Sequence, residues 1–292
     1  TNELLINQFH DILPGTCIPR AHDEAIKAVS HIIEEAGKQT AELLEEGTRR
    51  DAAQKTLTLV NNLSFPRNDV IYLPFEGWYV DGDYRQQVAE GLDGESRLAV
   101  AAGTVPAFGS VVLNLTREYA EGESPFLTEG NLLETPFLRV VFQKKGYLES
   151  LVDKRNGREL RGGGYALHTL LMAEGVPLGW DNWDIDADCE SKFRDCAELL
   201  SRKVVSDGAV EYRVRSHYRL SAKSDLTQDM IFYGDSPEVV FETRINWQDD
   251  HRFLKTAFDT AVHADFACHE VQFGYLRRVT NRNTSIEKAK FE

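Results

Sequence analysis

The strongest constraint on the fold is an alternation of apolar and polar residues over long stretches of the second half of the chain. Between residues 212 and 220, the apolar positions are Tyr212, Val214, Tyr218 and Leu220, and the basic positions between them are Arg213, Arg215, His217 and Arg219. The same period of two recurs in residues 241–247. Successive side chains of a β-strand point to opposite faces, so this period predicts long strands. With almost no helical signal between them, such strands predict a large antiparallel β-sandwich.

The first 50 residues follow the helical period instead. A short apolar-periodic segment runs into Pro14-Gly15, which cannot continue a helix, so His10 and Asp11 are expected in the last helical turn. A second segment predicts an amphipathic helix of about 25 residues, which we interpret as one member of a helical bundle. The apolar positions of that helix are Ala25, Val29, Ile32, Ala36 and Leu43.

The middle of the chain predicts a smaller β-structure. From about residue 54, short alternating segments separated by turns indicate a small β-sandwich, and the polar residues 118–124 indicate a linker. Farther on, Asn156-Gly157 predicts the turn of a hairpin. We therefore expect a mainly β chain with an N-terminal helical segment, divided into residues 1–50, a small sandwich at 51–120 and a large sandwich at 121–292.

Charge and composition limit the kinds of partner. The formal net charge of −14 argues against nucleic acid or an anionic membrane, because both require a positive surface. No apolar run approaches the roughly 18–20 residues that a membrane helix needs. The four cysteines lack the Cys-x-x-Cys spacing of a zinc ribbon or redox pair, so free thiols are expected. A disulfide between Cys189 and Cys196 is the alternative.

His10 and Asp11 are the first candidate site residues. A ring nitrogen of His10 can bind a divalent metal, and the Asp11 carboxylate can accept hydrogen bonds from a polar ligand such as a sugar hydroxyl. One histidine does not define a metal site. On physical grounds alone, a His-Asp pair at the end of a helix is more often a capping or solvated pair than a ligand site.

Residues 180–188 are the second chemically rich stretch. On a strand, the carboxylates of Asp184, Asp186 and Asp188 would line one face and need solvent, a cation or a basic neighbour. An EF-hand is excluded, because positions 189 and 195 are not the required Gly and Glu. Trp180 could offer a ring face, and Asp181 a hydroxyl acceptor, to a bound sugar. Packing against a neighbouring domain is the alternative for both.

A resemblance to a known family favours a functional role for these candidate residues. Residues 7–15, with the sequence NQFHDILPG, resemble the segment that closes the catalytic domain of glycoside hydrolase family 38, the α-mannosidases. Further stretches similar to the bacterial branch follow in order at residues 180–186, 241–247, 272–275 and 282–285. The resemblance implies that His10 is a ligand of the active-site zinc and that Asp11 contacts the bound mannose. It also implies a mutarotase-like large sandwich that packs against a catalytic barrel.

The resemblance further implies that this chain is an internal piece of a retaining, metal-dependent enzyme that hydrolyses terminal α-mannosides. Family members carry an amino-terminal domain with a His-x-Asp metal pair and an aspartate that is both zinc ligand and nucleophile, and neither is found in the residues before His10. We expect the nucleophile and the acid/base upstream of Thr1, a large sandwich truncated at its C-terminus, and no hydrolysis by the chain alone. A cytoplasmic location and a homo-oligomer complete this expectation.

The competing hypothesis is a stand-alone carbohydrate-binding or structural β-sandwich module. Exposed aromatic rings would then hold a sugar, and the candidates are Phe75, Trp78 and Trp180. Core or inter-domain packing is the commoner role of such rings. The binding module predicts a sugar affinity that survives His10→Ala, whereas the enzyme fragment predicts none until the missing barrel is restored.

Overall fold

The computed structural model describes residues 2–47, 55–119, 121–180, 183–186, 188–271 and 274–288. Two helices come first, α1 (Asn2–Ile6) and α2 (Pro19–Gly47). Proline suits the first position of a helix, where its missing N–H group would have no helical partner, so α2 begins at Pro19. Among the described side chains of α2, Ala25 alone is buried. No helix in the described parts of the chain is long and apolar enough to cross a membrane.

Two three-stranded antiparallel sheets follow and form the small sandwich. One sheet has the strand order β1-β6-β3 and the other has the order β2-β5-β4. Their strands are β1 (Thr56–Val60), β2 (Val70–Pro74), β3 (Tyr79–Val80), β4 (Gln86–Glu90), β5 (Ser96–Ala101) and β6 (Ser110–Thr116). Apolar side chains from both sheets make one core, in which Val100 and Leu113 are almost fully buried.

The large sandwich packs a five-stranded sheet, in the order β11-β10-β9-β8-β7, on a four-stranded sheet, in the order β14-β15-β16-β17. The strands of the five-stranded sheet are β7 (Leu127–Glu129), β8 (Leu132–Glu134), β9 (Leu138–Phe142), β10 (Leu148–Asp153) and β11 (Arg158–Glu159). Those of the four-stranded sheet are β14 (Glu198–Asp207), β15 (Glu211–Arg219), β16 (Asp225–Tyr233) and β17 (Val239–Asn246). Between them lies a core that includes Val140, Val214 and Phe232.

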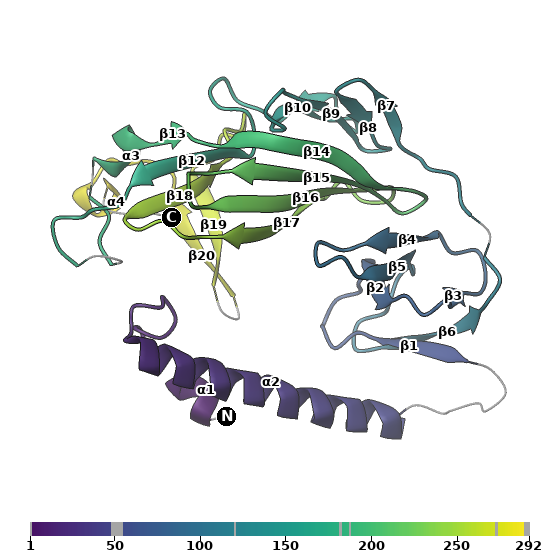
Figure 1. The fold of residues 1–292 in the computed structure, drawn as a ribbon. Helices are drawn as coiled ribbons and strands as arrows, with labels where there is room; N and C mark the ends of the chain where they lie inside the picture. The colour runs from purple at the N-terminus through teal and green to yellow at the C-terminus, as the bar shows by residue number, and fades with distance from the viewer. Residues whose placement is uncertain are drawn as a thin grey trace.

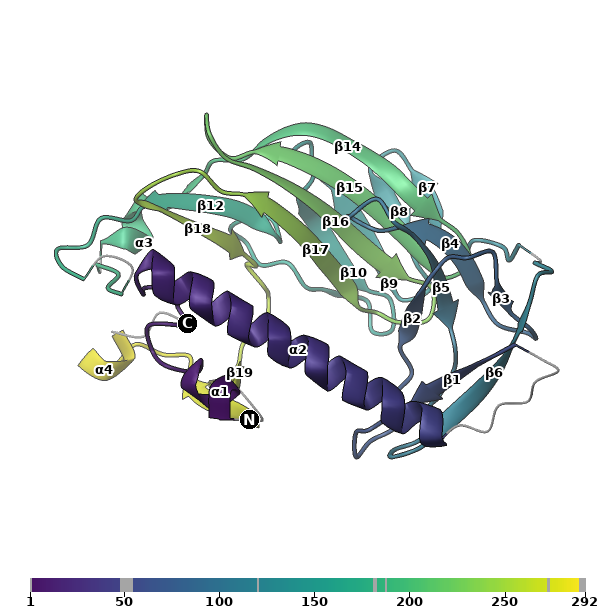
Figure 2. The same ribbon diagram turned by 60° about the horizontal axis from the view of Figure 1, so that its bottom comes forward.

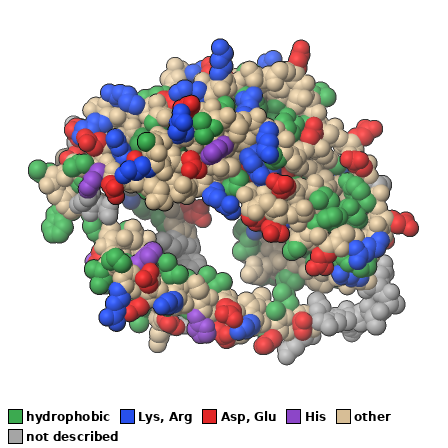
Figure 3. Space-filling view, in the orientation of Figure 1, with side chains coloured by type: hydrophobic (Ala, Val, Ile, Leu, Met, Phe, Trp, Pro, Cys, Tyr) green, Lys and Arg blue, Asp and Glu red, His purple; other side chains and the backbone are tan. Residues whose placement is uncertain are grey.

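Smaller elements extend the large sandwich. They are β12 (Thr169–Glu174), α3 (Cys189–Lys192), β13 (Arg194–Asp195), β18 (Arg252–Ala257), β19 (Phe266–Val271), β20 (Gly274–Val279) and α4 (Ser285–Lys288). The sheet β13-β12-β18 continues the sandwich toward α3, as Figure 1 shows. In the space-filling view, an opening separates the helical segment from the sheets above it (Figure 3).

The fold class predicted from the sequence is confirmed. The structure is mainly β, with an N-terminal helical segment, a small sandwich and a large antiparallel sandwich. The predicted hairpin is also present: β10 pairs antiparallel with β11, and Gly157 takes the positive φ of 68° that the turn requires.

The polar face of β15 is buried where the two sandwiches meet. The Arg213 side chain is 1% exposed, and its guanidinium group donates hydrogen bonds to Glu211 at 2.8 Å, Asp229 at 3.1 Å and Glu242 at 2.6 Å. Burial alone would lower the pKa of Arg213, but the hydrogen bond and charge of Glu211, followed by the other two carboxylates, raise the pKa above its ordinary value. The arginine therefore stays charged inside the protein.

Side chains of the small sandwich complete this buried network. The Tyr72 hydroxyl donates to Glu211 at 2.5 Å, and the Gln87 amide nitrogen donates to the Glu211 carbonyl at 3.1 Å. Arg215 donates to Glu90 at 2.7 Å. Burial, and next the charge of Glu211, raise the pKa of Tyr72 far above its ordinary value, so the hydroxyl keeps its proton. The two sandwiches are thus joined by satisfied polar contacts.

Gly146 marks a close approach between the β9–β10 turn and β15. Its φ is +83°, and a Cβ atom there would lie 2.6 Å from the Tyr218 hydroxyl oxygen. We expect Gly146→Ala to lower the free energy of unfolding by about 2 kcal/mol, from left-handed strain together with the clash. Urea unfolding measures the change. Gly94→Ala has the same strain, but no atom of the described residues lies within 4 Å of the added Cβ, so it should cost less; equal losses would contradict the clash.

Candidate functional site

The segment that carries His10 and Asp11 is a run of turns. The predicted placement in the last helical turn is wrong, because α1 already ends at Ile6. The N–H groups of Gln8 and Phe9 donate to carbonyls three residues back, at 3.1 and 3.2 Å, a pattern that tightens and ends a helix. The next turns close on the Phe9 carbonyl, which accepts from the N–H groups of residues 12 and 13. The candidate pair therefore lies on a loop between α1 and α2.

This loop leaves His10 and Asp11 accessible. Their side chains are 66% and 43% exposed, and His10 Nε2 lies 3.6 Å from Asp11 Oδ2. Thr16 Oγ1 donates to Asp11 Oδ1 at 2.9 Å, and the Cys17 N–H donates to the Asp11 carbonyl at 3.1 Å. One carboxylate oxygen is thus anchored by the loop, while the other faces the imidazole. Both side chains can take part in contacts beyond this loop.

The described residues between β12 and α3, 175–180, 183–186 and 188, form a loop, so the strand considered for the three aspartates is not present in them. Pro177 cannot donate to a sheet, and Trp180 has a φ of +55°, which breaks extended backbone. The N–H groups of Trp183 and Asp184 both donate to the Trp180 carbonyl, at 2.7 and 3.0 Å. The backbone donors are used inside the loop and are not available to a neighbouring strand.

The structure brings these two loops together. The rings of His10 and Trp183 have centroids 6.0 Å apart and are tilted by 56°. In both ribbon views, the loop after α1 lies next to the loop before α3 (Figures 1 and 2). Trp180, in the same loop as Trp183, is 79% exposed, whereas Asp181 lies outside the described residues. Sequence analysis did not single out Trp183; the repeated Trp-Asp pairs, at 180–181 and 183–184, were the available signal.

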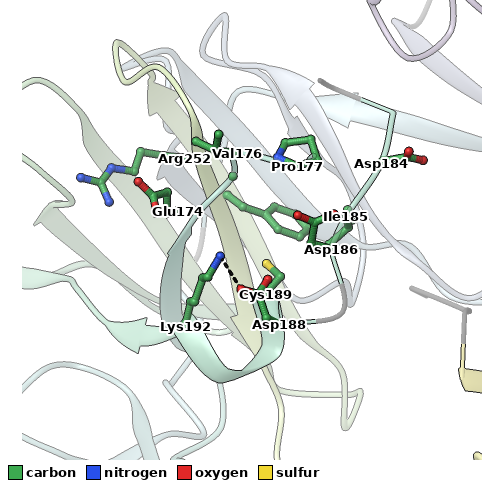
Figure 4. A pocket seen from close by; sticks show the side chains of 12 residues that line it. Glu174, Val176, Pro177, Asp184, Ile185, Asp186, Asp188, Cys189, Lys192 and Arg252 are labelled. Carbon is green, nitrogen blue, oxygen red and sulfur yellow. Dashed lines mark ion pairs between the residues drawn. The ribbon is translucent and has the colours of Figure 1, made fainter. Parts of the chain in front are cut away.

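The loop between β12 and α3 also lines a cavity of about 230 Å³, shown in Figure 4. Asp184, Asp186 and Asp188 all line it, as do Lys192 and Arg252. Lys192 Nζ lies 2.8 Å from Asp188, and Asp186 accepts from the Leu178 N–H at 3.2 Å. Of the three partners considered for these carboxylates, a basic neighbour is present, although the carboxylates are gathered by a loop and not by the face of a strand.

Among these side chains, His10 is the candidate zinc ligand. Zinc takes four ligands, and imidazole and carboxylate are suitable donors. In the described ranges, no group of three or more His, Cys, Asp or Glu side chains is arranged to hold a metal ion. All four cysteines are free, so the alternative Cys189–Cys196 disulfide is not formed. His10 thus fits one position of a zinc shell, and the remaining ligands would have to come from polypeptide outside the described residues.

The other aromatic candidates have partners within the small sandwich. The Arg117 guanidinium lies 3.8 Å from the centroid of the Trp78 ring, and the Lys55 ammonium lies 4.5 Å from it. Phe75 and Tyr79 pack against the core of that sandwich, with ring centroids 5.4 Å apart. These contacts favour packing over a sugar-stacking platform at this position.

Comparison with known proteins decides the family. Residues 133–292, more than half of the chain, match the domain described as "Glycosyl hydrolases family 38 C-terminal domain". The chain belongs to glycosyl hydrolase family 38. The resemblance seen in the motifs of residues 7–15 and 180–186 is thereby confirmed at the level of the family.

Relatives of this family 38 chain are much longer than the chain itself. It is 28% identical over 297 residues to alpha-mannosidase 2C1 of Homo sapiens, covering 99% of this chain and 27% of the relative. It is 26% identical to alpha-mannosidase G of Dictyostelium discoideum, covering 99% of this chain and 30% of that protein. The chain therefore spans only about a quarter to a third of the length of these relatives.

Two solved structures share the fold. A glycosyl hydrolase family 38 protein from Enterococcus faecalis superposes with a TM-score of 0.68 at 13% identity, over 95% of this chain and 42% of that one. An alpha-mannosidase from Enterococcus faecalis V583 gives a TM-score of 0.63 at 15% identity, over 96% of this chain and 40% of that one.

Proposed function

We propose that this chain forms part of a retaining, metal-dependent α-mannosidase that hydrolyses terminal α-mannosides of mannose-containing glycans. The main support is the exposed His10-Asp11 pair beside the tryptophan loop, in a chain whose relatives include alpha-mannosidases. The long relatives support a further part of the proposal, that the complete protein has an amino-terminal catalytic domain. A cytoplasmic location and a homo-oligomer remain predictions.

Each candidate residue has a role in this proposal. His10 provides one imidazole ligand of a zinc ion. Asp11 accepts a sugar hydroxyl on the oxygen that Thr16 does not occupy. Trp180, 79% exposed, offers its ring face to the C–H groups of the sugar, and Asp181 remains a proposed hydroxyl acceptor. A zinc ion, when bound, would act as a Lewis acid toward the sugar hydroxyls.

The catalytic carboxyl groups are assigned to the rest of the enzyme. Retaining glycosidases need two carboxyl groups roughly 5–5.5 Å apart, one as nucleophile and one as acid/base. We place both in the amino-terminal domain. Apolar side chains left exposed on the helical segment, among them Leu5 at 63%, Ile33 at 67% and Leu43 at 70%, provide a surface on which that domain can pack.

The test compares the 292-residue chain with the full-length protein on an aryl α-mannoside. We expect turnover with retained anomeric configuration, followed by NMR, from the full-length protein, and no turnover from the chain alone. In the full-length protein, His10→Ala should lower kcat/KM by about a hundredfold and reduce bound zinc, because one metal ligand is lost. His31→Ala, at an exposed position of α2, is the matched control. Turnover by the chain alone, abolished by His10→Ala, would contradict the assignment.

The exposed Trp180 ring also suits a stand-alone carbohydrate-binding module, which is the second candidate function. Calorimetric titration of the 292-residue chain with mannose and methyl α-mannoside separates the two. Affinity that is lost in Trp180→Ala and kept in His10→Ala favours the binding module. The enzyme fragment predicts no measurable affinity.

A further inference from the structure

We propose that Trp183 is a positioning residue that orients the imidazole of His10 for metal binding. The inference rests on the proposed function and extends it to a residue of the large sandwich. Its starting point is the contact between two segments that are far apart in the sequence, with ring centroids 6.0 Å apart. Trp183 is about half exposed, so its ring lies at the surface where the two loops meet.

Trp183 can serve as a fixed support because its loop is anchored on both sides. Its own N–H donates to the Trp180 carbonyl at 2.7 Å. Farther along, Ile185 packs against the buried cluster that contains Cys189 and Phe193. The Asp186 carboxylate accepts the Leu178 N–H at 3.2 Å. These contacts tie the backbone around Trp183 to β12 and α3, so the indole is presented from the folded sandwich.

His10, in contrast, remains largely exposed. Its side chain is 66% exposed, and its contacts in its own loop include the Phe9 ring, with centroids 4.1 Å apart, and Asp11 at 3.6 Å. An exposed imidazole must lose rotamer freedom when it binds a metal, and a ring held in advance loses less. Residues that orient a metal ligand typically contribute 10–100-fold in metal affinity or activity. Trp183 lies where such a residue would be needed.

The experiment uses the full-length protein and four variants. Trp183→Ala removes the support, Trp183→Phe keeps an aromatic ring, Leu178→Ala is the control from the same loop with a 98% exposed side chain, and His10→Ala tests the ligand itself. Zinc affinity is measured by competition with a chelator, and KM for an aryl α-mannoside is measured at saturating zinc. Circular dichroism and thermal melting confirm that each variant is folded.

We expect Trp183→Ala to weaken zinc binding about tenfold, with an unchanged KM at saturating zinc, and Trp183→Phe to restore most of the affinity. Leu178→Ala should leave zinc affinity unchanged. An unchanged zinc affinity in Trp183→Ala would overturn the inference, as would a raised KM alone, which would mean direct substrate contact. If His10→Ala itself leaves zinc binding unchanged, the proposed role of His10 fails. That outcome is distinct from a failure at Trp183 alone.

Discussion

Replacing Arg213 by alanine is expected to destabilise the chain by about 3–5 kcal/mol, because it leaves the buried Glu211 carboxylate without its counter-charge, whereas Asp229 keeps Arg215 at 2.8 Å. Glu211 and Asp229 are both 0% exposed and both accept hydrogen bonds from this guanidinium group. Solvent cannot replace the lost partner unless the contact between the sandwiches opens. Urea denaturation followed by circular dichroism measures the change in the free energy of unfolding.

Arg219, on the same face of β15, provides the matched control. Its side chain is 53% exposed and pairs with Glu198, which is 57% exposed. Such a surface pair contributes about 0–1 kcal/mol, so Arg219→Ala should change stability little. A loss of less than about 1 kcal/mol in Arg213→Ala would mean that water reaches Glu211 and Asp229 in the native protein, against the burial described above.

Acid should destabilise the protein through His168 as the pH falls from about 6.5 to about 4. The residue is 2% exposed, and burial lowers its pKa to about 4 although the hydrogen bond to Gln228, at 2.5 Å, acts in the opposite direction. Phe241 and Phe258 pack near the ring, and Nδ1 has no hydrogen-bond partner among the described residues. The folded protein therefore holds the imidazole neutral.

The protein loses stability in acid because its folded and unfolded states bind protons differently at His168. Between pH 6.5 and 4, the unfolded chain binds a proton at this histidine and the folded chain does not, so stability decreases as the pH falls. Below about pH 4 both states are protonated, and the total loss is about 3 kcal/mol. Urea midpoints measured from pH 7 to pH 4 should show this slope. His168→Asn should reduce it, because asparagine does not titrate and tolerates the φ of +67°.

The exposed His31 gives the comparison for that experiment, since its imidazole is solvated whether or not α2 is folded. His31→Asn should leave the pH slope of the parent protein in place. If His168→Asn and His31→Asn show the same slope as the parent, the acid sensitivity arises elsewhere.

Local sequence patterns were sufficient for the fold class. The alternation in residues 212–220 and 241–247 corresponds to β15 and β17, and the amphipathic period after Pro19 corresponds to α2. In each case the signal lies within the element itself, because the side-chain period follows from the backbone geometry. The turn at Asn156-Gly157 was predictable for the same reason.

Features that depend on distant segments were not predictable. Nothing local to Arg213 indicates that Tyr72 and Gln87 of another sandwich will help to bury the carboxylate beside it. The contact between the His10 and Trp183 rings likewise depends on two loops that different elements hold in place. The strand considered for the three aspartates is not formed in the described residues 183–186, because the N–H groups of Trp183 and Asp184 bond to the Trp180 carbonyl within the loop. The alternation of side chains gives no sign of this competition for backbone donors.

The network between the sandwiches has a practical consequence for dissecting this protein. The exposed connection at residues 121–124 looks like a natural place to cut the chain, and a protease should reach it. Cleavage there would not release two independent pieces, because Tyr72, Gln87 and Glu90 of the small sandwich remain hydrogen-bonded to β15 of the large sandwich. The halves should co-purify after digestion, and either half expressed without the other would carry unpaired polar groups on its surface.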